Sequence, residues 1–180
     1  MFASSSTMRR ARRPLVMLAV LALPLSVATA CGSDDEPKTQ AESVTIGDQW
    51  VKASDKGMTG AFGKLTNTSD EEVTLTGGDS DVAGRVEVHE MAPNADGSMS
   101  MRQVDGGLTI AGGQTLTLEP GGNHIMLMDL KGPIKAGETV TITLRFGDGS
   151  QRDLVADARD FRGANEEYAP GHGSGDASDG

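Results

Sequence analysis

The sequence of 180 residues predicts an all-β domain, a single Greek-key β-sandwich. Short runs of alternating apolar and polar residues, rich in Val, Thr, Ile and Leu, follow one another along most of the chain. Gly, Asp, Asn and Pro separate the runs at the interval typical of a sandwich, and no long stretch has helical periodicity. The runs are SVTIG, WVKA, GAFGKLTN, EVTLTG, GRVEVHEM, SMSMRQV, LTI, TLTL, HIMLM, TVTITLRF and, after a Gly-Asp-Gly turn, RDLVAD.

The N-terminal segment is organised like a secretory signal peptide. The basic segment MRRARR precedes the apolar run PLVMLAVLALPLSV, which is too short for a comfortable membrane span, and ATA then leads directly to Cys31. A small residue before a lone cysteine resembles the cleavage site of bacterial lipoproteins, in which this cysteine carries the lipid. We therefore expect a signal peptide over 1–30 and lipidation of Cys31, which would anchor the exported chain to the outer face of the cell membrane. Secretion with a free thiol is the alternative, and Sec and twin-arginine export both stay open.

The rest of the chain is predicted to comprise a tether, one domain and a tail. Residues 31–43 hold the lipidated cysteine and a flexible tether, residues 44–158 form the β-sandwich, and residues 159–180 form a disordered tail rich in Gly, Asp and Ser. Cys31 is the only cysteine, so an intramolecular disulfide and a cluster of thiolate ligands are excluded. Removal of four leader arginines changes the formal net charge from −10 to −14, which argues against nucleic acid as a partner.

Methionine and histidine are concentrated in one part of the predicted sandwich. Five of the six methionines beyond the leader and two of the three histidines lie between residues 89 and 128. They are His89, Met91, Met99, Met101, His124, Met126 and Met128. Because side chains alternate along a strand, HIMLM places its histidine and both methionines on one face, with Ile125 and Leu127 on the other. VEVHEM and SMSMRQV likewise each present two of these side chains on a common face.

Imidazole and thioether groups together form a soft, neutral set of metal ligands. Thioethers bind Zn²⁺ and Mg²⁺ poorly but suit Cu(I), and histidine binds either oxidation state of copper. A set without a hard oxygen or a charged thiolate favours Cu(I) over Cu(II). The alternative is that methionine fills gaps in a core and that hydrogen bonds satisfy the histidines. That alternative does not explain why a His-x-Met pair occurs twice.

The same segments resemble the PCu(A)C family of periplasmic and extracellular copper chaperones. HEM, MSMRQV and PGGNHIMLMDLK follow the family's spacing of His, Met and His-x-Met. WVKA, GAFGKLTNTSDEEVTL and VAGRVEVHE match the segments that precede the site in the family, so the resemblance spans residues 44–156. It implies a cupredoxin-like β-sandwich with a solvent-accessible Cu(I) site.

The resemblance also implies the ligands. Those that fit the family's pattern are His89, Met101, His124 and Met126. The segments VDGGL and APNADGS are longer than the family's usual form, so Met99 stays open as the alternative to Met101. Met91 and Met128 are secondary candidates, and His172 in the tail is a candidate auxiliary ligand for Cu(II).

A copper chaperone is a binding protein and not an enzyme. The resemblance implies delivery of copper to the copper site of a respiratory oxidase, such as a cytochrome c oxidase subunit, or to another copper chaperone. Copper storage requires the same site, and a metal-free adhesive or scaffolding sandwich is the third hypothesis. A blue-copper electron carrier is opposed because its thiolate ligand is missing, Cys31 being outside the domain. The sequence contains neither a Ser/His/Asp set nor a close pair of carboxylates that would support a hydrolase.

Overall fold

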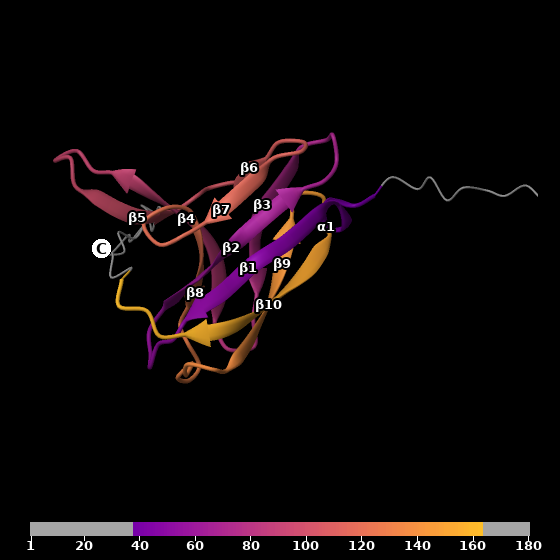
Figure 1. Cartoon of the computed structure of the whole chain (residues 1–180). Coiled ribbons are helices and arrows are strands. Elements are labelled where there is room, and N and C mark those ends of the chain that lie inside the picture. Colours follow the sequence, from indigo (N-terminus) through magenta and orange to yellow (C-terminus); the bar gives the residue numbers. More distant parts are fainter. Residues whose placement is uncertain (1–37, 164–180) are drawn as a thin grey trace, which may run out of the picture. The chain divides into compact units, whose positions relative to one another are not determined.

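The computed structural model describes residues 38–163, and this part of the chain contains ten β-strands and one short helix (Figure 1). The elements are α1 (Gln40–Ser43), β1 (Val44–Lys52), β2 (Thr59–Asn67), β3 (Val73–Asp79), β4 (Arg85–Pro93), β5 (Met99–Gln103), β6 (Leu108–Ile110), β7 (Thr115–Leu118), β8 (His124–Met128), β9 (Thr139–Phe146) and β10 (Gln151–Arg159). The predicted signal peptide, Cys31 and His172 lie outside the described residues. Within residues 38–163, no helix has the length and apolar character needed to cross a membrane.

Hydrogen bonds join the strands into one sheet that closes on itself. The strand order is β5-β4-β8-β2-β1-β10-β9-β3-β6, with β7 paired to β2. A further pairing of β3 with β4, through Gly78 and Val86, connects the two parts of this path, so the strands from β4 to β3 form a barrel-like ring. Strands β1 and β10 are parallel, whereas the other strand pairs are antiparallel. The predicted all-β fold is confirmed.

The ring encloses one aliphatic core, to which alternate residues of its strands contribute. Ile125 and Leu127 of β8 are almost completely buried in this core, together with Val88 of β4 and Ile142 and Leu144 of β9. Burial of each such side chain stabilises the fold by roughly 1.5–3 kcal/mol. The methionines of β8 lie outside this core and form a separate cluster. The two faces of β8 therefore differ in chemistry, as the alternation in HIMLM predicts.

Two of the predicted runs, SVTIG and WVKA, belong to the single strand β1. The strand continues through a bulge between Gly47 and Trp50, where its register with β2 shifts by one residue. Asp48 lies in this bulge with a φ of 54°, in the left-handed region that short polar side chains tolerate. The bulge interrupts the alternation of apolar and polar residues, and the sequence pattern therefore predicts two strands in place of one.

Helix α1 occupies residues that the sequence analysis assigns to the tether. Thr39 and Glu42 form a capping box, in which each side chain accepts a hydrogen bond from the other residue's backbone N–H. The Gln40 side-chain oxygen accepts hydrogen bonds from the backbone N–H groups of Thr74 and Gly147, both at 3.1 Å. These contacts attach α1 to the barrel, so the folded part begins before residue 44.

The other end of the folded part also extends beyond its predicted boundary. Strand β10 ends at Arg159, within the predicted tail, and Phe161 then packs against Trp50 with ring centroids 5.3 Å apart. The Lys52 ammonium donates a hydrogen bond to the carbonyl oxygen of Gly163. The tail is therefore attached to the end of β1 through its first residues.

Candidate metal site

The candidate ligands lie on β4, β5 and β8, on the side of the sheet opposite the aliphatic core. His89 of β4 is directly opposite His124 of β8 in the antiparallel register, and their ring centroids are 5.8 Å apart. Met101 of β5 is opposite Met91 of β4. Pairing of these three strands thus brings together side chains that are far apart in the sequence.

The ring of His124 is oriented by a backbone carbonyl. Its Nδ1 lies 2.8 Å from the carbonyl oxygen of Gly122, which can only accept a hydrogen bond, so in the neutral ring Nδ1 carries the hydrogen. The Nε2 atom then presents a lone pair, 2.8 Å from the Sδ atom of Met101. Two lone pairs that face one another are unfavourable in the absence of a cation, and a soft cation bound by both atoms would relieve this contact. Protonation of the ring would replace that arrangement with an N–H···S hydrogen bond.

His89 is oriented by a carboxylate instead. Its Nε2 lies 2.9 Å from Oε2 of Glu87, so Nε2 carries the hydrogen in the neutral ring and Nδ1 presents the lone pair. The side chain is completely buried. This burial lowers the pKa of His89 below its usual value, although the hydrogen bond to Glu87 acts in the opposite direction. His89 is consequently neutral at neutral pH, which is the form that binds metal ions.

The methionines form a second apolar cluster. Met101, Met126 and Met128 are each about 4–5% exposed and pack together, with Met91 against them. Met99 is 54% exposed and is outside this cluster. Of the two methionines that the sequence left as alternatives, Met101 is therefore the one whose sulfur contacts a histidine.

A cavity of about 320 Å³ opens beside this cluster. Its wall includes Met101, His124 and Met126 and, from other segments, Lys52, Met58 and Phe62. The Phe62 ring lies 6.2 Å from the His124 ring and 4.6 Å from that of Trp50, measured between centroids. Gly60 is opposite Met126 in the register, and a Cβ atom there would be only 2.6 Å from the Phe62 ring. Glycine at this position allows the aromatic ring to lie beside the ligand strand.

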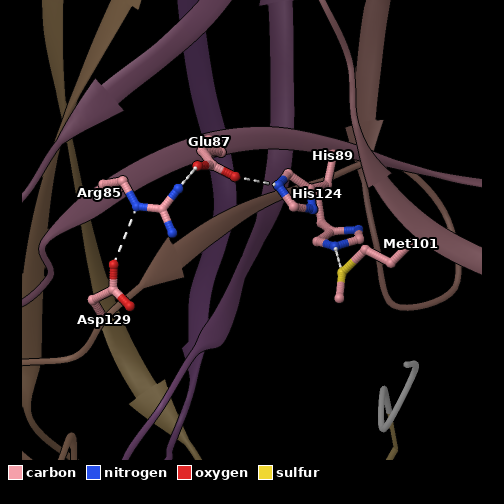
Figure 2. A network of polar contacts seen from close by, with 6 residues as sticks. All are labelled: Arg85, Glu87, His89, Met101, His124 and Asp129. Atoms are coloured by element: carbon pink, nitrogen blue, oxygen red, sulfur yellow. Dashed lines mark hydrogen bonds and ion pairs between the residues drawn. The ribbon is translucent and has the colours of Figure 1, made fainter. Parts of the chain in front are cut away.

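A chain of polar contacts leads from His89 to the surface (Figure 2). Glu87 receives the His89 hydrogen bond on Oε2 and an Arg85 hydrogen bond on Oε1, at 2.6 Å. The Arg85 Nε also donates to Asp129, at 3.1 Å. Glu87 is 8% exposed, whereas the side chains of Arg85 and Asp129 are largely exposed.

The donor set determines which metal ions fit the site. Within residues 38–163, no three His, Cys, Asp or Glu side chains come close enough to hold a metal ion together. The methionines that lie beside His89 and His124 offer thioether sulfurs, and hard cations prefer oxygen ligands. The arrangement suits a soft monovalent cation.

Comparison with known proteins identifies the family. The family model described as "Putative lipoprotein LpqE-like" matches residues 44–157. This chain belongs to the LpqE-like lipoprotein family. The LpqE-like chain is also 38% identical over 164 residues to "Putative lipoprotein Lxx21020" of Leifsonia xyli subsp. xyli, an alignment that covers 91% of this chain and 98% of that relative.

Solved structures confirm that the LpqE-like chain is a PCu(A)C-like protein with a cupredoxin-like β fold. The solution structure of CuI-DR1885 from Deinococcus radiodurans is 30% identical, with a TM-score of 0.52, and the match covers 79% of this chain and 97% of that one. The copper-bound PCuAC domain from PmoF2 is 18% identical, with a TM-score of 0.54 and coverages of 66% and 94%.

Sequence reasoning missed one polar residue of the LpqE-like site. Strand alternation indicates the histidines and methionines as ligands, but it assigns no role to Glu87. A signal was present, because Arg85, Glu87 and His89 alternate on one face of a strand whose other face is apolar. Three ionisable side chains at alternate positions on one face of a strand, two of them buried, indicate a polar network.

Proposed function

We propose that this LpqE-like protein is an extracytoplasmic Cu(I) chaperone, which binds copper through its His/Met site and passes it to an acceptor. The observation that carries the proposal is the 2.8 Å contact between Nε2 of His124 and Sδ of Met101. Both atoms present lone pairs when the ring is neutral, and one soft cation would satisfy both. Similarity to CuI-DR1885 and to the copper-bound PCuAC domain from PmoF2 supports the same assignment.

Cu(I) is the cargo, and two imidazoles and two thioethers hold it in this proposal. His89 binds through Nδ1 and His124 through Nε2, while Met101 and Met126 bind through sulfur. All four ligands are neutral, so the lower oxidation state is favoured. Met91 and Met128 pack around the ligands and exclude water, and Met99 is not a ligand.

Access to the site supports transfer. Met101, His124 and Met126 line the cavity, whereas His89 is completely buried behind them. A ligand from an acceptor protein would therefore reach the copper ion from the cavity and displace the thioethers before the buried imidazole. Cavity-side thioethers are weak enough as ligands to be exchanged, so the bound ion can leave in steps.

The acceptor in this proposal is the copper site of a respiratory oxidase or another copper chaperone. A lipid on Cys31 would hold the protein at the outer face of the cell membrane, where such acceptors are reached without a soluble carrier. The chain is strongly acidic and would not bind an anionic membrane through its surface charge, so the lipid would be its membrane anchor.

Transfer can be tested directly. The mature protein is loaded with Cu(I) under reducing conditions and mixed with the metal-free soluble copper-site domain of a cytochrome c oxidase subunit. We expect copper to appear in the acceptor, measured by metal analysis after separation. Retention of all copper by the LpqE-like protein would favour storage, and a failure to take up Cu(I) at all would contradict copper binding.

A further inference from the structure

Glu87 is a buried carboxylate among candidate copper ligands. It precedes His89 by two residues on the same face of β4, and in the register it is directly opposite Met126 of β8. It therefore lies between an imidazole and a thioether that the proposed function assigns to copper. Its 8% exposure distinguishes it from Glu90 on the same strand, which is more exposed and pairs with Arg102.

Burial of a carboxylate is unfavourable unless hydrogen bonds and an opposite charge compensate it. Here both oxygens are engaged, Oε1 by Arg85 at 2.6 Å and Oε2 by His89 at 2.9 Å. Asp129 in turn accepts a hydrogen bond from Arg85 at 3.1 Å. The carboxylate is thus held in one orientation, with one oxygen directed at the His89 ring (Figure 2).

The orientation of this carboxylate determines which nitrogen of His89 is free of hydrogen. An ionised carboxylate only accepts hydrogen bonds, so the neutral ring must carry its hydrogen on Nε2. The other tautomer would direct two lone pairs at each other across 2.9 Å. Nδ1, the nitrogen that the proposed function assigns to copper, therefore keeps its lone pair.

We propose that Glu87 is a positioning residue of the copper site, which binds the Nε2–H of His89 and thereby presents Nδ1 to Cu(I). Arg85 supports this role by holding the second carboxylate oxygen. The inference rests on the proposed function, because it assigns Glu87 a role in the binding of the same metal ion. Partners of this kind typically contribute 10–100-fold to metal affinity.

The first measurement is the tautomer of His89 in the metal-free protein, read from the ¹⁵N chemical shifts of its ring. We expect the Nε2–H tautomer in the wild type and loss of that preference in Glu87→Ala. The Nδ1–H tautomer in the wild type would overturn the inference without any reference to copper. Failure of the wild type to bind Cu(I) is a separate result, which would contradict the proposed function.

The second measurement is Cu(I) affinity, by competition with a Cu(I) chelator. Glu87→Ala should bind Cu(I) 10–100-fold more weakly than the wild type. Glu90→Ala removes a carboxylate one residue beyond His89. Its Cu(I) affinity should stay within about threefold of that of the wild type, a change well below the one expected for Glu87→Ala. Equal affinity of Glu87→Ala and the wild type would overturn the inference.

Glu87→Gln separates the hydrogen bond from the negative charge, and its similar shape preserves the packing if the alanine variant does not fold. Its single carbonyl oxygen can accept from His89 or from Arg85, so either tautomer can result, and the affinity should follow the tautomer. Retention of Nε2–H with affinity near that of the wild type, or loss of Nε2–H with weaker binding, agrees with the inference. Weaker binding with Nε2–H retained, or unchanged binding with Nε2–H lost, would overturn it.

Discussion

His89 and His124 are direct partners across β4 and β8, yet their rings are oriented by different groups. Glu87 holds Nε2 of His89, whereas the carbonyl of Gly122 holds Nδ1 of His124. The two neutral rings therefore present different nitrogens, Nδ1 from His89 and Nε2 from His124. One histidine is buried behind the site and the other lines the cavity.

Substitutions of the three residues on this face of β8 should weaken Cu(I) binding to different extents. His124→Ala should weaken Cu(I) binding more than Met126→Ala, because imidazole is the stronger donor. Met128→Ala should have the smallest effect, since Met128 is opposite Arg85 and packs beside the ligands. Competition titrations with a Cu(I) chelator give the three affinities. Equal affinity of the wild type and His124→Ala would contradict the ligand assignment.

Met101 and Met99 provide a matched pair, because both are methionines on the same face of β5. Met101→Leu should lower Cu(I) affinity at least tenfold, since leucine fills a similar volume without offering a sulfur. Met99→Leu should have no measurable effect, because Met99 is 54% exposed and outside the cluster. A larger loss in Met99→Leu would show that the alternative ligand of the sequence analysis is the correct one.

The two faces of β8 should separate stability from binding. Leu127 is completely buried in the aliphatic core, so Leu127→Ala should lower the free energy of unfolding by about 2–5 kcal/mol. Met126→Leu conserves volume and should cost less than about 1.5 kcal/mol. Urea unfolding of the metal-free protein measures both values. A Met126→Leu variant as unstable as Leu127→Ala would indicate that the methionine cluster is a structural core.

The buried His89 should make the stability of the metal-free protein depend on pH. Burial lowers its pKa below the ordinary value of 6.5, so at mildly acidic pH His89 is protonated more readily in the unfolded chain than in the folded one. The free energy of unfolding should therefore decrease as the pH falls below about 6.5, and the decrease should be smaller in His89→Gln. Urea unfolding from pH 5 to 8 gives both curves. Parallel curves for the two proteins would contradict this reasoning.

The proposed lipid anchor can be tested independently of the metal. Cys31→Ser should release the protein from the membrane fraction while its fold and Cu(I) affinity stay unchanged, because Cys31 precedes the described residues 38–163 in the sequence. Fractionation of cells in high salt, followed by detection of the protein, measures the release. Membrane association that persists in Cys31→Ser would indicate a second anchor.

Strand alternation was sufficient to predict the all-β fold and the shared face of His124, Met126 and Met128. Such local periodicity depends only on backbone geometry, which the residue pattern records directly. The bulge at Asp48 was not predicted, because it depends on pairing between strands, and a pairing register is not written in the sequence of a single strand. Alternation places Glu87 on the same face as His89, but the burial of Glu87 depends on the strands packed beside β4.

Helix α1 illustrates a different kind of omission. The segment Thr39–Glu42 contains a capping-box pattern, but a helix of four residues has no periodicity that could reveal it. Its attachment through Gln40 depends on backbone groups of Thr74 and Gly147, more than thirty residues away. The described fold therefore includes residues 40–43, ahead of the predicted domain start at residue 44.

The length of β1 separates the point where the chain enters the barrel from the cavity. The strand begins at α1, where the chain enters the barrel (Figure 1). It ends at Lys52, which lines the cavity. Nine residues of strand span about 30 Å, so the entry of the chain and the cavity are at opposite ends of the barrel. If the chain is anchored through Cys31, as proposed above, the tether joins the barrel at the end away from the cavity, and the cavity end stays available to a partner protein.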